Sequence, residues 1–212
     1  ARIEAAAESV LASLDQLLLT VPVGEIVREG AVVVIAGPPN VGKSSLFNAL
    51  LGKSRAIVTE IPGTTRDALE GVIDTGKWPL RLIDTAGLRE TGDRIEQMGI
   101  EVSERYLAGA QVVLACAEST ASLDQIKEVV GKRTEAPVLS VRTKADLVAN
   151  GEKLPASAIA VSAETGLGLK ELLGAIDHII DRSQGTIPAD VPILTRARHR
   201  KALDSARRDV AQ

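Results

Sequence analysis

One segment of the sequence has the residue types and the spacing that phosphate binding requires. Residues 37–44 read Gly-Pro-Pro-Asn-Val-Gly-Lys-Ser and match the pattern G-x4-G-K-[ST]. The glycines let the backbone wrap a phosphate with N–H groups turned inward, Lys43 reaches the β- and γ-phosphates, and Ser44 offers its hydroxyl to Mg²⁺. A helix expected directly afterwards adds the dipole of its N-terminus. The pattern predicts a nucleotide-phosphate site at Asn40, Val41, Gly42, Lys43, Ser44 and Ser45.

Two later motifs are typical of loops that surround a γ-phosphate, although each is weak alone. In the polar loop with Gly63, Thr64 and Thr65, a threonine hydroxyl can complete a Mg²⁺ shell when a γ-phosphate is present. Asp84-Thr85-Ala86-Gly87 ends an expected strand, where the carboxylate suits a Mg²⁺ shell and Gly87 lets the backbone approach the γ-phosphate. By themselves, Thr-Thr is an ordinary loop dipeptide and Asp-x-x-Gly marks turns.

Two further motifs suit the recognition of a guanine base. In Thr143-Lys144-Ala145-Asp146, the carboxylate can accept hydrogen bonds from guanine N1–H and N2–H₂, and the stem of Lys144 can cover the base. In Ser162-Ala163-Glu164, a backbone N–H can meet guanine O6. Each motif alone is weak, and the first also reads as a plain helix N-cap. Because every motif lies at a predicted strand end, where open α/β sheets bind ligands, together they indicate a guanine-nucleotide site.

The elements that must position these motifs follow from the apolar patterning. Short apolar runs alternate with helical periodicity, which predicts an α/β fold with a mostly parallel sheet and helices on both faces. We expect strands at 31–36, 68–75, 79–84, 111–117, 137–142 and 158–162, with a tight turn around Gly76-Lys77. We expect helices at 7–20 (ending near Val21-Pro22), 45–51, 95–108, 121–132, 169–180 and 191–212, and a linker over 182–190.

Composition bounds the kind of protein. The chain has 212 residues, with 25 Lys+Arg against 28 Asp+Glu. This near balance of charge argues against a protein that binds nucleic acid with its whole surface. Only Phe47, Trp78 and Tyr106 are aromatic, which excludes base-stacking platforms, and the lone Cys116 excludes a disulfide framework. The longest purely apolar run, at 31–36, is far shorter than the roughly 20 residues of a membrane span. We therefore expect a cytoplasmic protein with no membrane segment.

The order of these motifs resembles the GTPase fold of the translation-factor-like class, and longer stretches narrow the resemblance. These are the residues at 37–45, Ile-Val-Thr-Glu-Ile-Pro-Gly-Thr-Thr-Arg-Asp at 57–67, Asp-Thr-Ala-Gly-Leu-Arg-Glu at 84–90, and Ile-Glu-x-x-Gly-Ile-Glu at 95–101. Together they resemble the tRNA-modification GTPase family MnmE, also called TrmE. The flanks at 26–30 and 196–199 resemble that family's helical domain.

The resemblance implies an organisation and raises one question. It implies a P-loop GTPase domain over 30–182, with remnants of a helical domain over 1–29 and, after a linker, within 183–212. The family's folate-binding domain and its C-terminal Cys-x-Gly-Lys end are not in this sequence, so we expect a fragment. Thr143 stands where the family usually has Asn. Guanine preference should survive through Asp146, while the tie that Asn makes between the base loop and the phosphate loop is left open.

The resemblance also assigns site residues and cofactors. It implies that GTP or GDP contacts the phosphate loop and Thr59, Glu60, Ile61, Pro62, Gly63, Thr64, Thr65, Asp84, Thr85, Ala86, Gly87, Thr143, Lys144, Asp146, Ser162, Ala163 and Glu164. It implies Mg²⁺ at Ser44 and Thr65, and K⁺ at Asn40, Thr59, Ile61 and Thr64.

The same resemblance points to a catalytic residue. Leu88 occupies the place where many GTPases carry a water-orienting Gln, and Leu cannot orient water by hydrogen bonding. The resemblance gives this role to Glu96, acting on water, with K⁺ replacing an arginine finger. The non-functional interpretations are that Glu96 is a solvent-exposed charge in the first turn of a helix and that Asn40 is a residue that favours turns.

The resemblance implies K⁺-stimulated, dimerisation-dependent GTP hydrolysis that switches the modification of the wobble uridine at tRNA position 34. It implies a homodimer formed through the GTPase loops, an FAD-dependent partner called MnmG, and tRNA in the full complex. The basic C-terminal segment could approach tRNA phosphates, although a solvated helix face explains it as well. The alternatives are a GTPase of ribosome assembly, or a GTP-dependent binding module with negligible hydrolysis.

Overall fold

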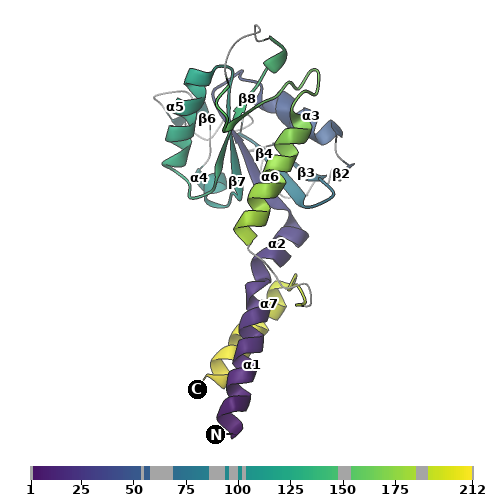
Figure 1. Cartoon of the computed structure of the whole chain (residues 1–212), viewed down its shortest axis with the longest axis vertical. Helices are drawn as coiled ribbons and strands as arrows, with labels where there is room; N and C mark the ends of the chain where they lie inside the picture. Colours follow the sequence, from purple (N-terminus) through teal and green to yellow (C-terminus); the bar gives the residue numbers. More distant parts are fainter. Residues whose placement is uncertain are drawn as a thin grey trace. The chain divides into compact units, whose positions relative to one another are not determined.

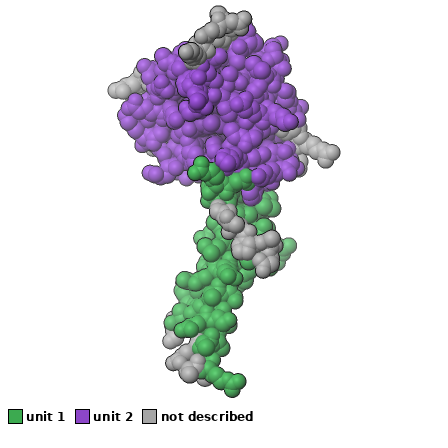
Figure 2. Space-filling view, viewed as in Figure 1, with its two compact units in different colours: residues 1–30, 181–212 green, residues 31–180 purple. Residues whose placement is uncertain are grey.

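The computed structural model describes residues 2–53, 55–57, 69–85, 94–95, 100–101, 104–147, 154–184 and 191–211. The chain forms two compact units, one of residues 31–180 and one of residues 1–30 with 181–212 (Figure 2). Each unit is described by itself below.

The larger unit is built on a seven-stranded sheet with the strand order β2-β3-β4-β1-β7-β8-β9 (Figure 1). Strand β3 is antiparallel to β2 and β4, whereas the pairs β4–β1, β1–β7, β7–β8 and β8–β9 are parallel. The prediction of a mostly parallel sheet is confirmed. The strands are β1 (Ala31–Ala36), β2 (Arg55–Ile57), β3 (Leu69–Asp74), β4 (Pro79–Asp84), β7 (Val112–Ala117), β8 (Val138–Arg142) and β9 (Ala158–Ala160).

Helices cover both faces of this sheet, as predicted (Figure 1). On one face, Leu107 of α4 (Glu104–Ala108) and Leu123, Ile126 and Val130 of α5 (Thr120–Gly131) pack against every second residue of β1 and β7. On the other face lie α3 (Lys43–Lys53), which contacts β1 to β4, and α6 (Leu169–Gln184). The central strands β1 and β7 are buried almost throughout because both of their faces are covered.

Three features of the structure differ from the sequence expectations. Among the residues of the helix predicted at 95–108 that the structure describes, α4 is the only helical part, because β5 (Arg94–Ile95) pairs antiparallel with β6 (Ile100–Glu101). Gly99 and the β-branched Ile95 and Ile100 weaken helix propensity there, and β-branched residues favour strands. Strand β2 was not expected in the polar segment after α3. The linker predicted to begin at residue 182 does not begin there, because α6 continues through Gln184.

The smaller unit contains α1 (Arg2–Leu19), α2 (Val21–Glu29) and α7 (Ala197–Val210). Helix α2 was not expected, because the sequence pattern ends a helix near Val21-Pro22. Pro22 instead lies in the first turn of α2, where its missing N–H needs no partner. The C-terminal helix is confirmed, although it starts only at Ala197.

Polar contacts join the helices of the smaller unit. The hydroxyl of Thr20 donates to Leu17 O (2.7 Å) and accepts from Leu194 N (3.1 Å). A Cβ on Gly24 would lie 1.9 Å from Leu194 O, so only glycine allows this close approach. Ion pairs join Arg207 of α7 to Asp15 of α1, and Arg200 to Glu25 of α2.

One stretch of this unit, Ala5–Glu29, is long and apolar enough to cross a membrane by length and composition alone. This differs from the sequence expectation, which considered only unbroken apolar runs. A packed helix of a globular unit and a signal sequence pass the same test, so the finding is weak evidence. Within the unit, the stretch is divided at Thr20 into two helices, and α1 packs against α7.

Candidate functional site

The phosphate loop of residues 37–42 connects β1 to α3 and closes around one lysine. Lys43, the first residue of α3, is 3% exposed, and its Nζ donates to Gly37 O (2.9 Å) and to Pro38 O (2.8 Å). A Cβ on Gly37 would lie 2.5 Å from Cys116 O, so this position tolerates no side chain. Gly42 has φ 97° and Asn40 has φ 62°, which are left-handed conformations that Gly and Asn adopt most readily. The loop is thus preformed around the ammonium of Lys43.

The acidic residue predicted for the metal shell lies directly beside this loop. Asp84 ends β4 and is fully buried, and it pairs in register with Ile35 of β1. The neighbouring Thr85 hydroxyl donates to Ile35 O at 2.8 Å, which ties the end of β4 to the strand that precedes the loop. The hydroxyl of Ser44 and the carboxylate of Asp84 are hard oxygen donors of the kind that Mg²⁺ prefers.

The buried Cys116, whose backbone carbonyl lies against Gly37 of the phosphate loop, has no role in this chemistry. Burial raises the pKa of its thiol to about 12, with the negative charge of Asp84 adding to the effect and the positive charge of Lys43 opposing it. The thiol therefore stays protonated at neutral pH, and its reactivity as a nucleophile is low.

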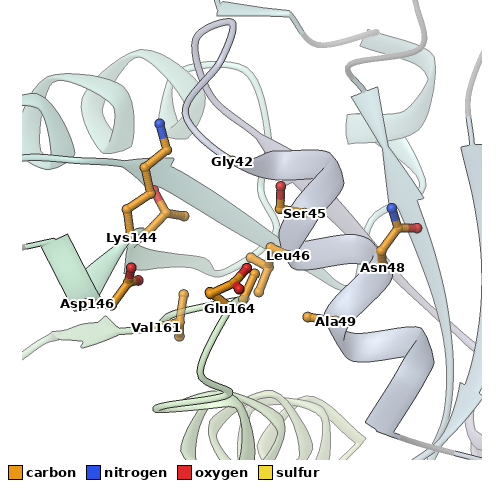
Figure 3. A pocket seen from close by; sticks show the side chains of 11 residues that line it. Gly42, Ser45, Leu46, Asn48, Ala49, Lys144, Asp146, Val161 and Glu164 are labelled. Carbon is orange, nitrogen blue, oxygen red and sulfur yellow. The ribbon is translucent and has the colours of Figure 1, made fainter.

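A pocket of about 480 Å³ lies at the other end of the site (Figure 3). Its volume is in the range of small-molecule sites. The lining residues come from the end of the phosphate loop, from α3, from the loop after β8 and from the loop after β9: Gly42, Ser45, Leu46, Asn48, Ala49, Thr143, Lys144, Asp146, Val161, Ala163 and Glu164. The structure therefore brings the predicted base-recognition residues Lys144, Asp146, Ala163 and Glu164 to one pocket. Sequence reasoning missed Asn48 and Ala49, although both follow Ser45 by about one helical turn.

Thr143, which stands where the family usually has Asn, links the base loop after β8 to the phosphate loop. Its side chain is 3% exposed, and its hydroxyl donates to Val41 O of the phosphate loop at 2.6 Å. A second acceptor, Ala117 O, lies 3.2 Å from the same hydroxyl and also receives the backbone N–H of Thr143 at 2.9 Å. The base loop and the phosphate loop are therefore tied together by threonine at this position.

The base loop after β8 and the loop after β9 are also joined by backbone hydrogen bonds. Ala145 N donates to Val161 O at 3.0 Å, and Val161 N donates to Arg142 O at 2.8 Å. The buried Ser162 hydroxyl accepts from Thr165 N at 3.1 Å, which shapes the turn before α6. Asp146 and Ala163 consequently line the same pocket from two strand ends.

Several predicted residues lie outside the described part of the chain. They are Thr59, Glu60, Ile61, Pro62, Gly63, Thr64, Thr65, Ala86, Gly87 and Glu96. Their roles remain predictions from the sequence.

Comparisons with known proteins identify the family. A family model described as 50S ribosome-binding GTPase matches residues 32–144, which is more than half of the chain. The tRNA modification GTPase MnmE of Moorella thermoacetica is 41% identical over 95% of this chain and 46% of that protein. MnmE of Methylorubrum populi is 47% identical over 86% of this chain and 39% of that protein. The chain spans less than half the length of these relatives.

Solved structures show the same fold. The G domain of the T. maritima FeoB iron transporter has a TM-score of 0.51 and 30% identity, and the match covers 71% of this chain and 99% of that domain. Aquifex aeolicus Era, bound to GDP·AlF4⁻, has a TM-score of 0.50 and 26% identity, with coverage of 77% and 58%. The chain therefore belongs to the P-loop GTPase family that the matching model describes, and it resembles the tRNA modification GTPases MnmE.

Proposed function

We propose that this GTPase drives a conformational switch in the modification of the wobble uridine, position 34, of tRNA. The observation that carries the proposal is the extent of the similarity. The MnmE relative from Moorella thermoacetica matches 95% of the chain, which includes most of the smaller unit, whereas the FeoB G domain matches 71% and Era 77%. The Era match leaves about a quarter of the chain uncovered, so the additional similarity of MnmE in the flanking helices favours the tRNA modification function.

Guanine recognition is proposed for the pocket of Figure 3. The carboxylate of Asp146 would accept hydrogen bonds from guanine N1–H and N2–H₂, and it would repel the corresponding edge of adenine. The stem of Lys144 would cover the base, while the backbone around Ser162 and Ala163 would donate to guanine O6. Glu164 lines the same pocket.

The phosphates would lie along the loop of residues 37–42 and the start of α3. Lys43 would face the β- and γ-phosphates, and the backbone of Gly42, Ser44 and Ser45 would donate to phosphate oxygens. Mg²⁺, when bound, supplies positive charge to the β- and γ-phosphates, and the oxygen donors Ser44 and Asp84 fit it, with Thr65 assigned from the sequence.

For hydrolysis, we propose that Glu96 orients the attacking water, because Leu88 cannot do so. We assign a K⁺ site to Asn40, Thr59, Ile61 and Thr64. The exposed Asn40 of the phosphate loop offers an oxygen donor for such an ion, and K⁺, when bound, supplies positive charge near the transferred phosphate. We propose that the segments carrying Thr59, Thr64 and Glu96 take part in pairing with a second GTPase domain.

We propose that the protein acts in the cytoplasm as a homodimer, with an MnmG-type FAD-dependent partner and with tRNA. The resemblance to the family supports this assignment, and no membrane contact is part of it.

A turnover assay distinguishes this proposal from the alternative of a binding module with negligible hydrolysis. GTP hydrolysis should be faster in KCl than in NaCl, and the rate per molecule should rise with protein concentration. Negligible turnover in both salts at every concentration would favour the binding module.

A chimera tests the tRNA modification function itself. Residues 1–212 would replace the matching segment of Moorella thermoacetica MnmE, and wobble-uridine modification would be measured in a strain that lacks its own MnmE. The chimera should restore modification, and the same chimera with Lys43→Ala should not. A chimera that folds and hydrolyses GTP but restores no modification would support the ribosome-assembly alternative.

A further inference from the structure

Two residues with unusual backbone conformations contact each other beside the pocket. Among the described residues, Asn40 (φ 62°) and Lys144 (φ 53°) are the non-glycine residues with positive φ. Such conformations are unfavourable for side-chain-bearing residues and persist when surrounding contacts impose them. Asn40 belongs to the phosphate loop and Lys144 to the base loop, and Lys144 Nζ donates to Asn40 O at 3.0 Å.

A third residue contacts the same ammonium. Glu118 follows β7, and its Oε1 lies 2.5 Å from Lys144 Nζ. The side chains are about half exposed, at 52% for Glu118 and 39% for Lys144, so the pair is open to salt. An ammonium has three N–H donors, and here one is directed to the phosphate loop and one to the carboxylate of Glu118. Sequence reasoning missed Glu118, although an acidic residue directly after the predicted strand at 111–117 was a possible signal.

The direction of the Lys144 side chain matters because a second carboxylate is close in sequence. Asp146 lines the same pocket two residues later, and it is the group proposed to receive the guanine edge. In Figure 3 the Lys144 amine points away from the Asp146 carboxylate, while the stem of Lys144 stays along the pocket. A Lys144 without its partner would be free to turn toward Asp146 and compete with guanine for that carboxylate.

We propose that Glu118 is a positioning residue for guanine-nucleotide binding. It holds the ammonium of Lys144 on the phosphate loop, keeps the stem of Lys144 over the base position, and leaves Asp146 available to guanine. The contact between Lys144 and Asn40 forms an outer tie beside the buried tie between Thr143 and Val41. Loss of Glu118 would therefore speed nucleotide release. This inference rests on the proposed guanine site.

The test measures release of fluorescent N-methylanthraniloyl-GDP from the full 212-residue chain by stopped flow. Glu118→Gln keeps the size of the side chain and removes its charge. Because half-exposed ion pairs are weak, we expect release to be roughly two- to fivefold faster, with little change in the association rate. Glu118→Asp should lie between the two. Glu135→Gln is the matched control, because Glu135 is also exposed and lies in the turn before β8.

Two further arms separate positioning from a general effect on the fold. In a Lys144→Met background, which keeps the stem without the charge, Glu118→Gln should add nothing. The difference between parent and Glu118→Gln should also shrink as NaCl rises from about 0.05 M to about 1 M, because salt screens exposed pairs. Equal release from parent and Glu118→Gln would overturn the proposal. So would an undiminished effect in the Lys144→Met background or at high salt.

Failure of the guanine site itself has a different signature. A parent chain that binds the GDP probe no better than the matching ADP probe would refute the proposed site before any Glu118 variant is compared. A parent with clear guanine preference, combined with unchanged release in Glu118→Gln, would refute the role of Glu118 alone.

Discussion

Replacing Thr143 by Val tests whether the tie between the base loop and the phosphate loop is a working part of the site. Valine keeps the branched shape at this buried position but has no hydroxyl to donate to Val41 O. The hydrogen bond of 2.6 Å is lost. Ala117 O keeps the backbone N–H of residue 143 at 2.9 Å, so the loss falls on Val41 O.

The size of the destabilisation follows from the number of carbonyls that lose a donor, which is one, because Val41 O loses the hydroxyl and Ala117 O keeps the backbone N–H. A buried polar group left without its hydrogen bond costs about 1–3 kcal/mol. Because one acceptor is affected, we expect the free energy of unfolding to fall by about that amount for Thr143→Val. Affinity for guanine nucleotide should fall about 10-fold, since about 1.4 kcal/mol corresponds to a factor of ten and the bound state needs an ordered phosphate loop.

The assay pairs urea unfolding, followed by circular dichroism, with equilibrium binding of fluorescent GDP. Thr143→Ser keeps the donor and should bind nearly as tightly as the parent. Thr143→Asn introduces the residue usual in the family and should also preserve binding. If Thr143→Val matched the parent in both stability and affinity, the tie would contribute nothing and the reasoning would be wrong.

Four further outcomes are expected. Asp146→Asn should weaken GTP binding more than about 10-fold in a competition assay against ATP, because two guanine donors lose their carboxylate partner. Lys43→Ala should abolish tight binding or turnover, whereas Ser44→Ala should mainly reduce the Mg²⁺ dependence measured by titration of the metal. Glu96→Ala should lower the single-turnover rate in K⁺ by about 10²–10⁴-fold with GTP affinity nearly unchanged, because the residue is proposed to contact water and not the nucleotide. Burial raises the pKa of Cys116 from 9.0 to about 12, so the folded state holds its proton more tightly than the unfolded state. The parent should therefore lose stability between about pH 9 and 12, by up to about 1.4 kcal/mol per pH unit, relative to Cys116→Ala in urea unfolding at each pH.

Some of this protein could be read from the sequence because the information is local. The run Ala31–Ala36 is apolar and rich in β-branched residues, which favours a buried strand wherever it occurs. The glycines and the lysine of residues 37–43 are likewise required by the local shape of a phosphate loop, and the structure has that shape around Lys43. The alternation of strands and helices then restricts the topology to a parallel sheet with its ligand-binding loops at one edge.

Other features depended on contacts between distant segments, and the sequence could not supply them. The segment 95–108 has some helical periodicity, but strand pairing between β5 and β6 prevails over it near Gly99. Whether Thr143 can make the link that Asn makes in the family depends on the distance between its hydroxyl and Val41 O, and Val41 is 102 residues away in sequence. The link from Glu118 through Lys144 to Asn40 likewise exists because three separate strand ends meet at one edge of the sheet. Residue types determined which chemistry was available, and the packing of the sheet decided which side chains come within hydrogen-bonding distance to perform it.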